Sequence, residues 1–347
     1  MLLSFEESKI DSIVLHHIGN SINNEPLIHG HQLISYNDQT HNYLKAYFLS
    51  TFKPAAFFHL HDEENLTNNI LFPVISAIFE NPSELITQSK FIASHLYEQS
   101  NHPAIKGGDF FVTYIKNCTV DREIVDAIGL YKIETKDTYL TVEQIENDFS
   151  LCSFDGININ RIDKGALIFN TSKEDGYILK VIDATNKGVH TNFWFDHFLQ
   201  VKQIEDAYFQ TGNVMQMTRD FIAQELPQNF KVEKADQIDM LNKSASYFNE
   251  QEQFDLSEYA NMVMQQPDII DQFNDFTTSY QRDKAISLEK NFEIDSSAVK
   301  KKKGVFKSVI KLDKNFHVYV HGDRNKIEQG TDEFGRKYYT LWYDQEN

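Results

Sequence analysis

Cysteine is scarce in this chain of 347 residues, which has only Cys118 and Cys152. No second Cys or His follows either one at the spacing of a zinc finger, so neither a disulfide framework nor a structural zinc site is predicted. We expect both thiols to be reduced and partly buried.

Long apolar runs are also missing. No stretch of about 18 apolar residues occurs, and the first ten residues carry Glu6 and Glu7 where a signal peptide needs a basic and then an apolar segment. These absences predict a cytoplasmic protein that has no membrane partner.

The signatures of several common enzyme classes are absent as well. The sequence contains no G-x-x-x-x-G-K-[ST], G-x-G-x-x-G, G-x-S-x-G or H-E-x-x-H pattern. Nucleotide hydrolysis, dinucleotide binding and the common hydrolase sites therefore have no support, and we expect no cofactor and no bound metal.

Basic residues are fewer than acidic ones: the chain has 33 Lys and Arg and 51 Asp and Glu, which gives a formal net charge of −18. A surface of this kind repels phosphate over most of its area. Residues 300–339 are the exception, with nine Lys and two Arg against five Asp or Glu. Any contact with DNA is therefore expected to be local and C-terminal.

Hydrophobic residues make up 41% of the chain and aromatic residues 13%, enough for a sizeable core. The length favours two domains, which we place at residues 1–209 and 210–347. The predicted fold class is α+β: an N-terminal, mainly antiparallel sheet with helices, then a helical C-terminal domain that ends in a small basic β-element.

Periodicity gives the expected elements. Pro73 is expected to break the helix predicted over residues 66–78, and an aromatic helix is expected from Asn192. The predicted strands are residues 10–18, 33–36, 110–115, 124–133, 166–170, 177–182, 308–312, 316–321 and 338–343; the other predicted helices are residues 83–96, 214–226, 237–249, 257–264 and 269–280.

The densest cationic run begins at Lys300, and the aromatic residues Phe306 and Phe316 are interleaved with the lysines that follow it. Flexible cations of this kind can each meet a backbone phosphate, although a solvated linker would have a similar composition. The predicted DNA-binding residues are Lys300, Lys301, Lys302, Lys303, Lys307, Lys311, Lys314, Arg324, Arg336 and Lys337.

Two histidine pairs have a spacing that metal-binding sites use, but the sequence places no third ligand beside either pair. His59 and His61 would point to the same side of an extended strand, and we interpret them as a solvated strand end. Gly30 between His29 and His31 suggests a turn.

Asp126, Glu134 and Lys136 superficially match the acidic residues and lysine of metal-dependent nucleases. In one extended strand the two acids would be over 25 Å apart by the rise of about 3.3 Å per residue, unless Gly129 bends the strand. We interpret Glu134 and Lys136 as one exposed face of an amphipathic strand and keep a nuclease as an alternative.

The order of several segments resembles the bacterial nucleoid-associated protein family of the YejK/NdpA type. The resemblance is carried by ID-x-I-x-LH at residues 10–16, the pair Gly107-Gly108, FWFDHFL at residues 193–199, Tyr247-Phe248-Asn249, and the short strands of residues 308–343. It implies nucleoid association and DNA binding without a known reaction.

Because one basic element binds DNA weakly, we also expect a homodimer, in which two elements raise avidity. The aromatic helix could bury either a core face or the dimer interface. An alternative class is a protein-interaction module that acts on a DNA enzyme such as a topoisomerase.

Overall fold

In a computed structural model, all residues are described except 53–54, 186–192, 321, 323 and 347. The chain divides into two compact units, residues 1–204 and 205–347, which are described separately below. Helix α4 (Ala207–Asp220) spans the boundary predicted between residues 209 and 210 and belongs to unit 2.

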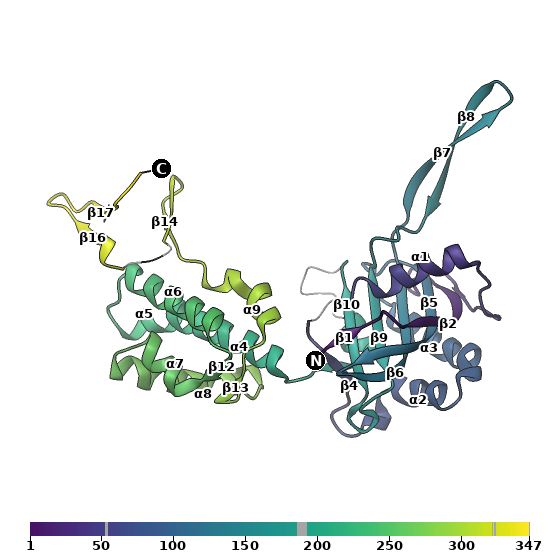
Figure 1. The fold of residues 1–347 in the computed structure, drawn as a ribbon, viewed down its shortest axis with the longest axis horizontal. Helices are drawn as coiled ribbons and strands as arrows, with labels where there is room; N and C mark the ends of the chain where they lie inside the picture. Colours follow the sequence, from purple (N-terminus) through teal and green to yellow (C-terminus); the bar gives the residue numbers. More distant parts are fainter. Residues whose placement is uncertain (53–54, 186–192, 321, 323, 347) are drawn as a thin grey trace. The chain divides into compact units, whose positions relative to one another are not determined.

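An antiparallel sheet forms the centre of unit 1, with the strand order β11-β4-β10-β9-β6-β5-β2-β3 and β1 paired to β5 (Figure 1). Its long central strands are rich in β-branched and aromatic residues, which suit a pleated surface. The strands are β1 (Leu3–Ser4), β2 (Lys9–Ile18), β3 (Leu27–Ile28), β4 (Phe58–Leu60), β5 (Gly108–Val120), β6 (Glu123–Ile133), β9 (Lys164–Phe169), β10 (Ile178–Asp183) and β11 (Val201–Gln203).

Both faces of this sheet are covered. Helix α1 (Asp38–Leu49) packs on one face, where Phe48 contacts a core that includes Phe111 and Leu167. Helices α2 (Leu71–Glu80) and α3 (Leu85–Gln99) pack on the other face, with Val112 and Ile168. The side chains of adjacent residues in one strand thus point to opposite faces of the sheet, and both faces are buried. This explains why the sequences of β5 and β9 are nearly continuously apolar.

The segment around Pro73 differs from a single kinked helix. A short 3-10 turn, Leu66–Asn68, is followed by a break, and α2 starts at Leu71, so Pro73 lies in the first helical turn, where proline is tolerated. Residues 33–36, predicted as a strand, form an irregular segment in which Ile34 N donates to Ile13 O at 2.9 Å.

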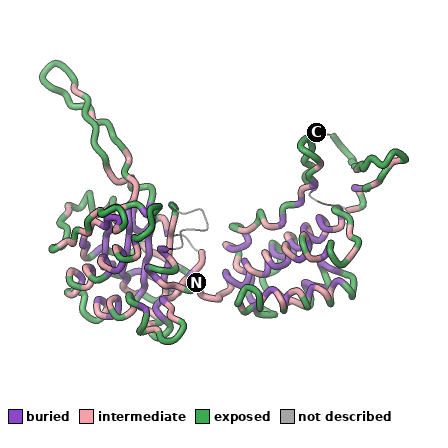
Figure 2. The backbone as a smooth tube through the Cα atoms, turned by 180° about the vertical axis from the view of Figure 1, so that it is seen from behind, coloured by how far each residue is buried: buried purple, intermediate pink, exposed green. Residues whose placement is uncertain are grey.

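A hairpin of β7 (Asp137–Ile145) and β8 (Asp148–Gly156) stands off the sheet of unit 1 (Figure 1). Figure 2 shows it exposed along most of its length. No strand was predicted over residues 137–156. Cys152 lies on it and is exposed, whereas Cys118 is buried, so the expectation of two partly buried thiols is wrong. Burial raises the pKa of the Cys118 thiol to about 12, with a further contribution from Asp126.

Unit 2 is mainly helical, and its core contains Phe221, Tyr247, Phe248, Tyr259 and Phe273. Its helices after α4 are α5 (Leu226–Asn229), α6 (Lys234–Glu250), α7 (Leu256–Val263), α8 (Pro267–Lys284) and α9 (Ser296–Lys302), with a π-helical turn at Phe221–Glu225. A small two-stranded antiparallel sheet of β12 (Gln253–Asp255) and β13 (Asn291–Glu293) joins this core.

Two hairpins end the chain: β14 (Val309–Leu312) with β15 (Phe316–Tyr319), and β16 (Ile327–Thr331) with β17 (Lys337–Leu341). Ile310 and Ile327 pack with Ile238 of α6 in a small separate core.

The predicted α+β class, with its antiparallel N-terminal sheet and its short C-terminal strands, is confirmed. His321, predicted to end a strand, and Asn192, predicted to begin a helix, lie outside the described residues. No helix among the described residues is long and apolar enough to span a membrane.

Candidate nucleic-acid interface

The lysine run is helical for most of its length. Asp295 caps α9 by accepting from Ala298 N at 2.8 Å, and Lys300, Lys301 and Lys302 form its last turn. An aspartate cap at the start and cations at the end both suit the helix dipole, which explains why a helix forms here.

Helix α9 packs against α4 through Lys302, whose Nζ donates to Gly212 O at 2.9 Å. Burial, together with the neighbouring Lys301, lowers the pKa of Lys302. The Nζ of Lys301 lies 5.9 Å from the centre of the Tyr208 ring, within the range of a cation–π contact. The run is therefore a packed part of unit 2 rather than a free linker.

Six cationic side chains line one cavity of about 680 Å³ in unit 2, which we call the basic pocket. They come from α4, α6, α9, β14 and the segment that leads into β14, and the other lining residues are neutral. The cations are Arg219, Lys234, Lys301, Lys302, Lys307 and Lys311.

Some of these cations already have partners. Arg219 Nη1 lies 3.0 Å from Asp220 Oδ1, and Lys234 Nζ donates to Gln237 Oε1 at 2.9 Å. Lys301, Lys307 and Lys311 are exposed, so their ammonium groups can reach a ligand in the pocket. Positive charges from four elements converge here, an arrangement that suits a polyanion.

The other predicted residues lie elsewhere on unit 2. Lys303 lines an adjoining cavity of about 460 Å³ that it shares with Lys307. Lys300, Lys314 and Lys337 are exposed on α9, in the β14–β15 turn and at the start of β17, respectively.

Both predicted arginines are ion-paired. Arg324 donates from Nε to Asp236 at 2.6 Å and from Nη2 to Glu233 at 2.7 Å, so it binds the two residues that form the capping box of α6. Arg336 Nε lies 2.7 Å from Asp332 Oδ2 across the β16–β17 turn. These contacts give both arginines a role in holding the C-terminal hairpins.

Sequence reasoning missed Arg219 and Lys234. Neither has another Lys or Arg within two residues of it, and no local pattern distinguishes it from other surface residues. Only the packing of α4 and α6 beside α9 brings them to the lysine run.

The proposed nuclease residues do not converge. Asp126 accepts from Tyr114 Oη at 2.8 Å, and Lys136 Nζ lies 2.9 Å from Asp109 Oδ2. Residues 127–132 pair with β9 in continuous register, so Gly129 does not fold the strand back. Asp126 and Glu134 therefore lie toward opposite ends of β6.

The interpretation of Glu134 as an exposed residue is wrong, because its side chain is only 5% exposed. Glu134 Oε1 lies 3.2 Å from Lys132 Nζ, and its Oε2 lies 3.6 Å from Lys164 Nζ. Lys164 Nζ also contacts Asp183 Oδ1 at 3.0 Å. Two buried lysines, on β6 and β9, are thus neutralised by carboxylates at the ends of β6 and β10.

The histidine pairs have structural partners. His59 hydrogen-bonds through Nδ1 to Asp175 O at 2.8 Å, and its ring centre lies 5.7 Å from that of His61. His29 and His31 lie near Ser94 and Lys90. Within the described parts of the chain, no group of three or more His, Cys, Asp or Glu residues is arranged to hold a metal ion.

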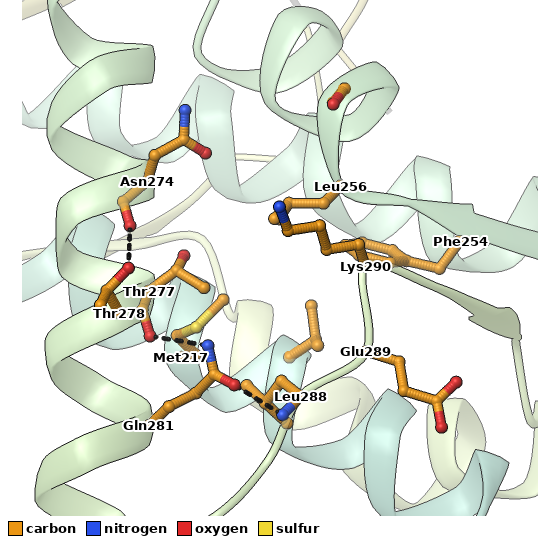
Figure 3. Close-up of a pocket in the computed structure, with 12 residues that line it drawn as sticks. Met217, Phe254, Leu256, Asn274, Thr277, Thr278, Gln281, Leu288, Glu289 and Lys290 are labelled. Carbon is orange, nitrogen blue, oxygen red and sulfur yellow. Dashed lines mark hydrogen bonds between the residues drawn. The ribbon is translucent and has the colours of Figure 1, made fainter.

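Another cavity of unit 2, of about 290 Å³, lies between α8 and the segment before β13 (Figure 3). One lining amide, Gln281, donates to Thr277 O at 3.2 Å and accepts from Leu288 N at 2.7 Å. These hydrogen bonds connect α8 to the segment before β13, and the charged residues Glu289 and Lys290 of that segment also line the cavity.

The comparison with curated proteins gives no match. A family profile described as nucleoid-associated protein YejK matches residues 14–335, which is most of the chain; the match extends over most of both units and covers the basic pocket and the hairpin β7–β8. The chain belongs to the nucleoid-associated protein YejK family.

Proposed function

We propose that the protein binds DNA through its basic pocket, contacts mainly the phosphate backbone and acts in the bacterial nucleoid without catalysing a reaction. The observation that carries this proposal is the convergence of six cations from separate elements on one cavity. Membership of a nucleoid-associated family supports the same general role.

Screening by salt allows a local DNA-binding site on a protein of negative net charge. At physiological salt the Debye length is about 8 Å, so carboxylates farther than this from the phosphates oppose binding only weakly. Lys301, Lys307 and Lys311 are exposed and are the residues that we assign to phosphate contacts. Lys302 is assigned to the packing of α9, and Arg324 and Arg336 to the C-terminal hairpins, because their charged groups already have partners.

Binding of this kind carries little sequence information, because phosphate contacts position a protein on DNA and base contacts specify the sequence. A single pocket would bind DNA weakly, with a dissociation constant on the order of 10⁻⁴ to 10⁻⁶ M. We therefore include a homodimer in the proposal, since two linked pockets raise avidity without new contacts.

The experiment is a salt titration of the wild-type protein on two unrelated DNA duplexes, followed by fluorescence anisotropy. The proposal predicts similar affinities on both duplexes and a linear fall of log affinity with log salt. A parallel incubation with Mg²⁺ or Mn²⁺ should leave plasmid DNA intact. Absence of binding at low salt would contradict the DNA-binding proposal, and cleavage would contradict its non-catalytic part.

A further inference from the structure

The hairpin β7–β8 carries more exposed apolar surface than a solvated ribbon can be expected to keep. Leu140, Val142, Phe149 and Leu151 are 67%, 64%, 70% and 65% exposed. No third strand or helix covers the ribbon among the described residues. An isolated two-stranded hairpin is marginally stable in water, so this element is expected to have a partner.

The four side chains share one face of the ribbon. Residues directly opposite each other in an antiparallel pair point to the same side, and Val142 pairs with Leu151. Leu140 and Phe149 lie on that side too, because side chains alternate along each strand. We call the surface formed by Leu140, Val142, Phe149 and Leu151 the apolar hairpin face.

Charge is segregated away from this face. Residues 137–156 contain five acids and no Lys or Arg. Asp137, Glu143 and Asp148 lie on the opposite side, and Glu146 lies in the turn. That opposite side also exposes Tyr139, Ile145 and Phe154, so its apolar residues are mixed with charge, whereas those of the apolar hairpin face are not. The one acid on the apolar side, Asp155, is at the base of the ribbon, where it accepts from Thr138 Oγ1 at 2.8 Å.

This distribution decides the kind of partner. DNA is disfavoured because the hairpin offers phosphate only negative charge. A basic protein recognised by charge would need the acids on the contact face, and they are elsewhere. An apolar face with almost no charge fits another apolar face. The same hairpin in a second copy of the chain offers such a face, and its acidic side chains would not be brought together by the contact.

We infer that the apolar hairpin face is the contact between two copies of this chain, packed face to face about a two-fold axis. Such a contact is isologous, so the same four residues are used by both copies. The inference specifies the surface of the homodimer in the proposed function. It does not depend on whether the basic pocket binds DNA.

The available area suits a reversible dimer. At about 100 Å² for each exposed apolar side chain, the four residues remove on the order of 400 Å² from water in each copy. Two copies give about 800 Å², half of a standard interface of about 1,600 Å². Thr138, Gln144 and Ser153 lie on the same side and add polar rim area.

The aromatic segment of residues 193–199 does not provide an equivalent surface. Phe193, Trp194, Phe198 and Leu199 of the π-helical turn Phe193–Leu199 are buried in the core of unit 1. The alternative that this helix forms the dimer interface is therefore wrong for its buried face. The hairpin retains exposed apolar residues that such an interface needs.

The test is sedimentation velocity on the full chain with a matched pair of variants, Val142→Lys and Thr141→Lys. The two residues are adjacent on β7 and point to opposite faces, so both add the same charge to the same ribbon. The wild-type protein and Thr141→Lys should dimerise at concentrations from about 1 to 100 µM, whereas Val142→Lys should raise the dissociation constant at least tenfold. A monomeric wild type, or equal effects of the two variants, would overturn the inference.

Cross-linking locates the contact without relying on loss of assembly. A Val142→Cys variant that also carries Cys152→Ser should form cross-linked dimers with a short bis-maleimide. The native Cys152, which pairs with Thr141 on the opposite face, should cross-link poorly. Efficient cross-linking through Cys152 and not through residue 142 would overturn the assignment of the face. A wild type that dimerises but does not bind DNA would remove the proposed DNA function and leave this inference intact.

Discussion

The Nζ of Lys302 donates to the backbone oxygen of Gly212 at 2.9 Å, and this hydrogen bond joins the lysine run to helix α4. A Cβ at residue 212 would lie 3.1 Å from that nitrogen, so glycine leaves the room that the ammonium group uses. One lysine of the run thus serves the fold, while its exposed neighbours remain available to a ligand.

Replacing Lys302 should affect stability more than DNA binding. Lys302→Ala removes the hydrogen bond to Gly212 and the packing of the long side-chain stem, and we expect unit 2 to lose about 1 kcal/mol of unfolding free energy. Urea denaturation measures this loss. Lys300→Ala, at an exposed position of the same helix, is the control and should change stability by no more than about 0.5 kcal/mol. Equal stability of the two variants would show that the Gly212 contact contributes nothing.

The buried ionic network of unit 1 should be sensitive to its central carboxylate. Glu134→Ala leaves Lys132 and Lys164 buried without that charge, and breaking a buried pair of this kind costs about 3 to 5 kcal/mol. Chemical denaturation is again the measurement, with Glu143→Ala on the exposed hairpin as the control. A loss below about 1 kcal/mol would mean that the lysines find other compensation.

His16 should make unit 1 sensitive to acid. Its side chain is buried near His29, His31 and Lys90, and burial together with these groups lowers the pKa of His16 from 6.5 to about 4. The folded state therefore binds the proton more weakly than the unfolded state. Stability is fully present above about pH 6.5 and falls as the pH decreases toward 4, by about 3 kcal/mol from this residue.

A His16→Gln variant tests this dependence. Gln keeps an acceptor for Gly30 N, which now donates to His16 Nδ1 at 3.1 Å, but it does not titrate. The fall in unfolding free energy between pH 7 and 4 should be smaller in the variant by about 3 kcal/mol. His102→Gln, at an exposed position, should behave as the wild type. Parallel curves for the wild type and His16→Gln would contradict the assignment.

Much of the fold could be predicted because hydrophobic alternation and helical periodicity are local. Residues 10–18 and 124–133 have these patterns and form β2 and β6. The hairpin β7–β8 was missed because its turn, Glu146-Asn147, contains no glycine and its apolar residues do not face a core. Residues 33–36 look like a strand, yet they form no strand ladder; the hydrogen bond from Ile34 N to Ile13 O of β2 does not continue into regular pairing.

The candidate site was only partly predictable for a related reason. Charge density along the sequence identifies Lys301, Lys307 and Lys311, but it cannot show that Lys302 is packed against α4. Arg219 and Lys234 join the pocket through tertiary packing. Glu134 seemed exposed because strand register, which places Lys132 beside Lys164, is not encoded in a local pattern.

The most direct measurement of the central claim compares the salt dependence of DNA binding for two double variants. Lys307→Ala with Lys311→Ala removes two exposed cations of the basic pocket, and Lys284→Ala with Lys290→Ala removes two exposed cations of unit 2 that do not line it. The account predicts that the first variant flattens the slope of log affinity against log salt by about 2, from roughly 0.9 per phosphate, on any duplex. The second should keep the wild-type slope. A wild-type slope in the folded pocket variant, or equal flattening in both, would contradict the account.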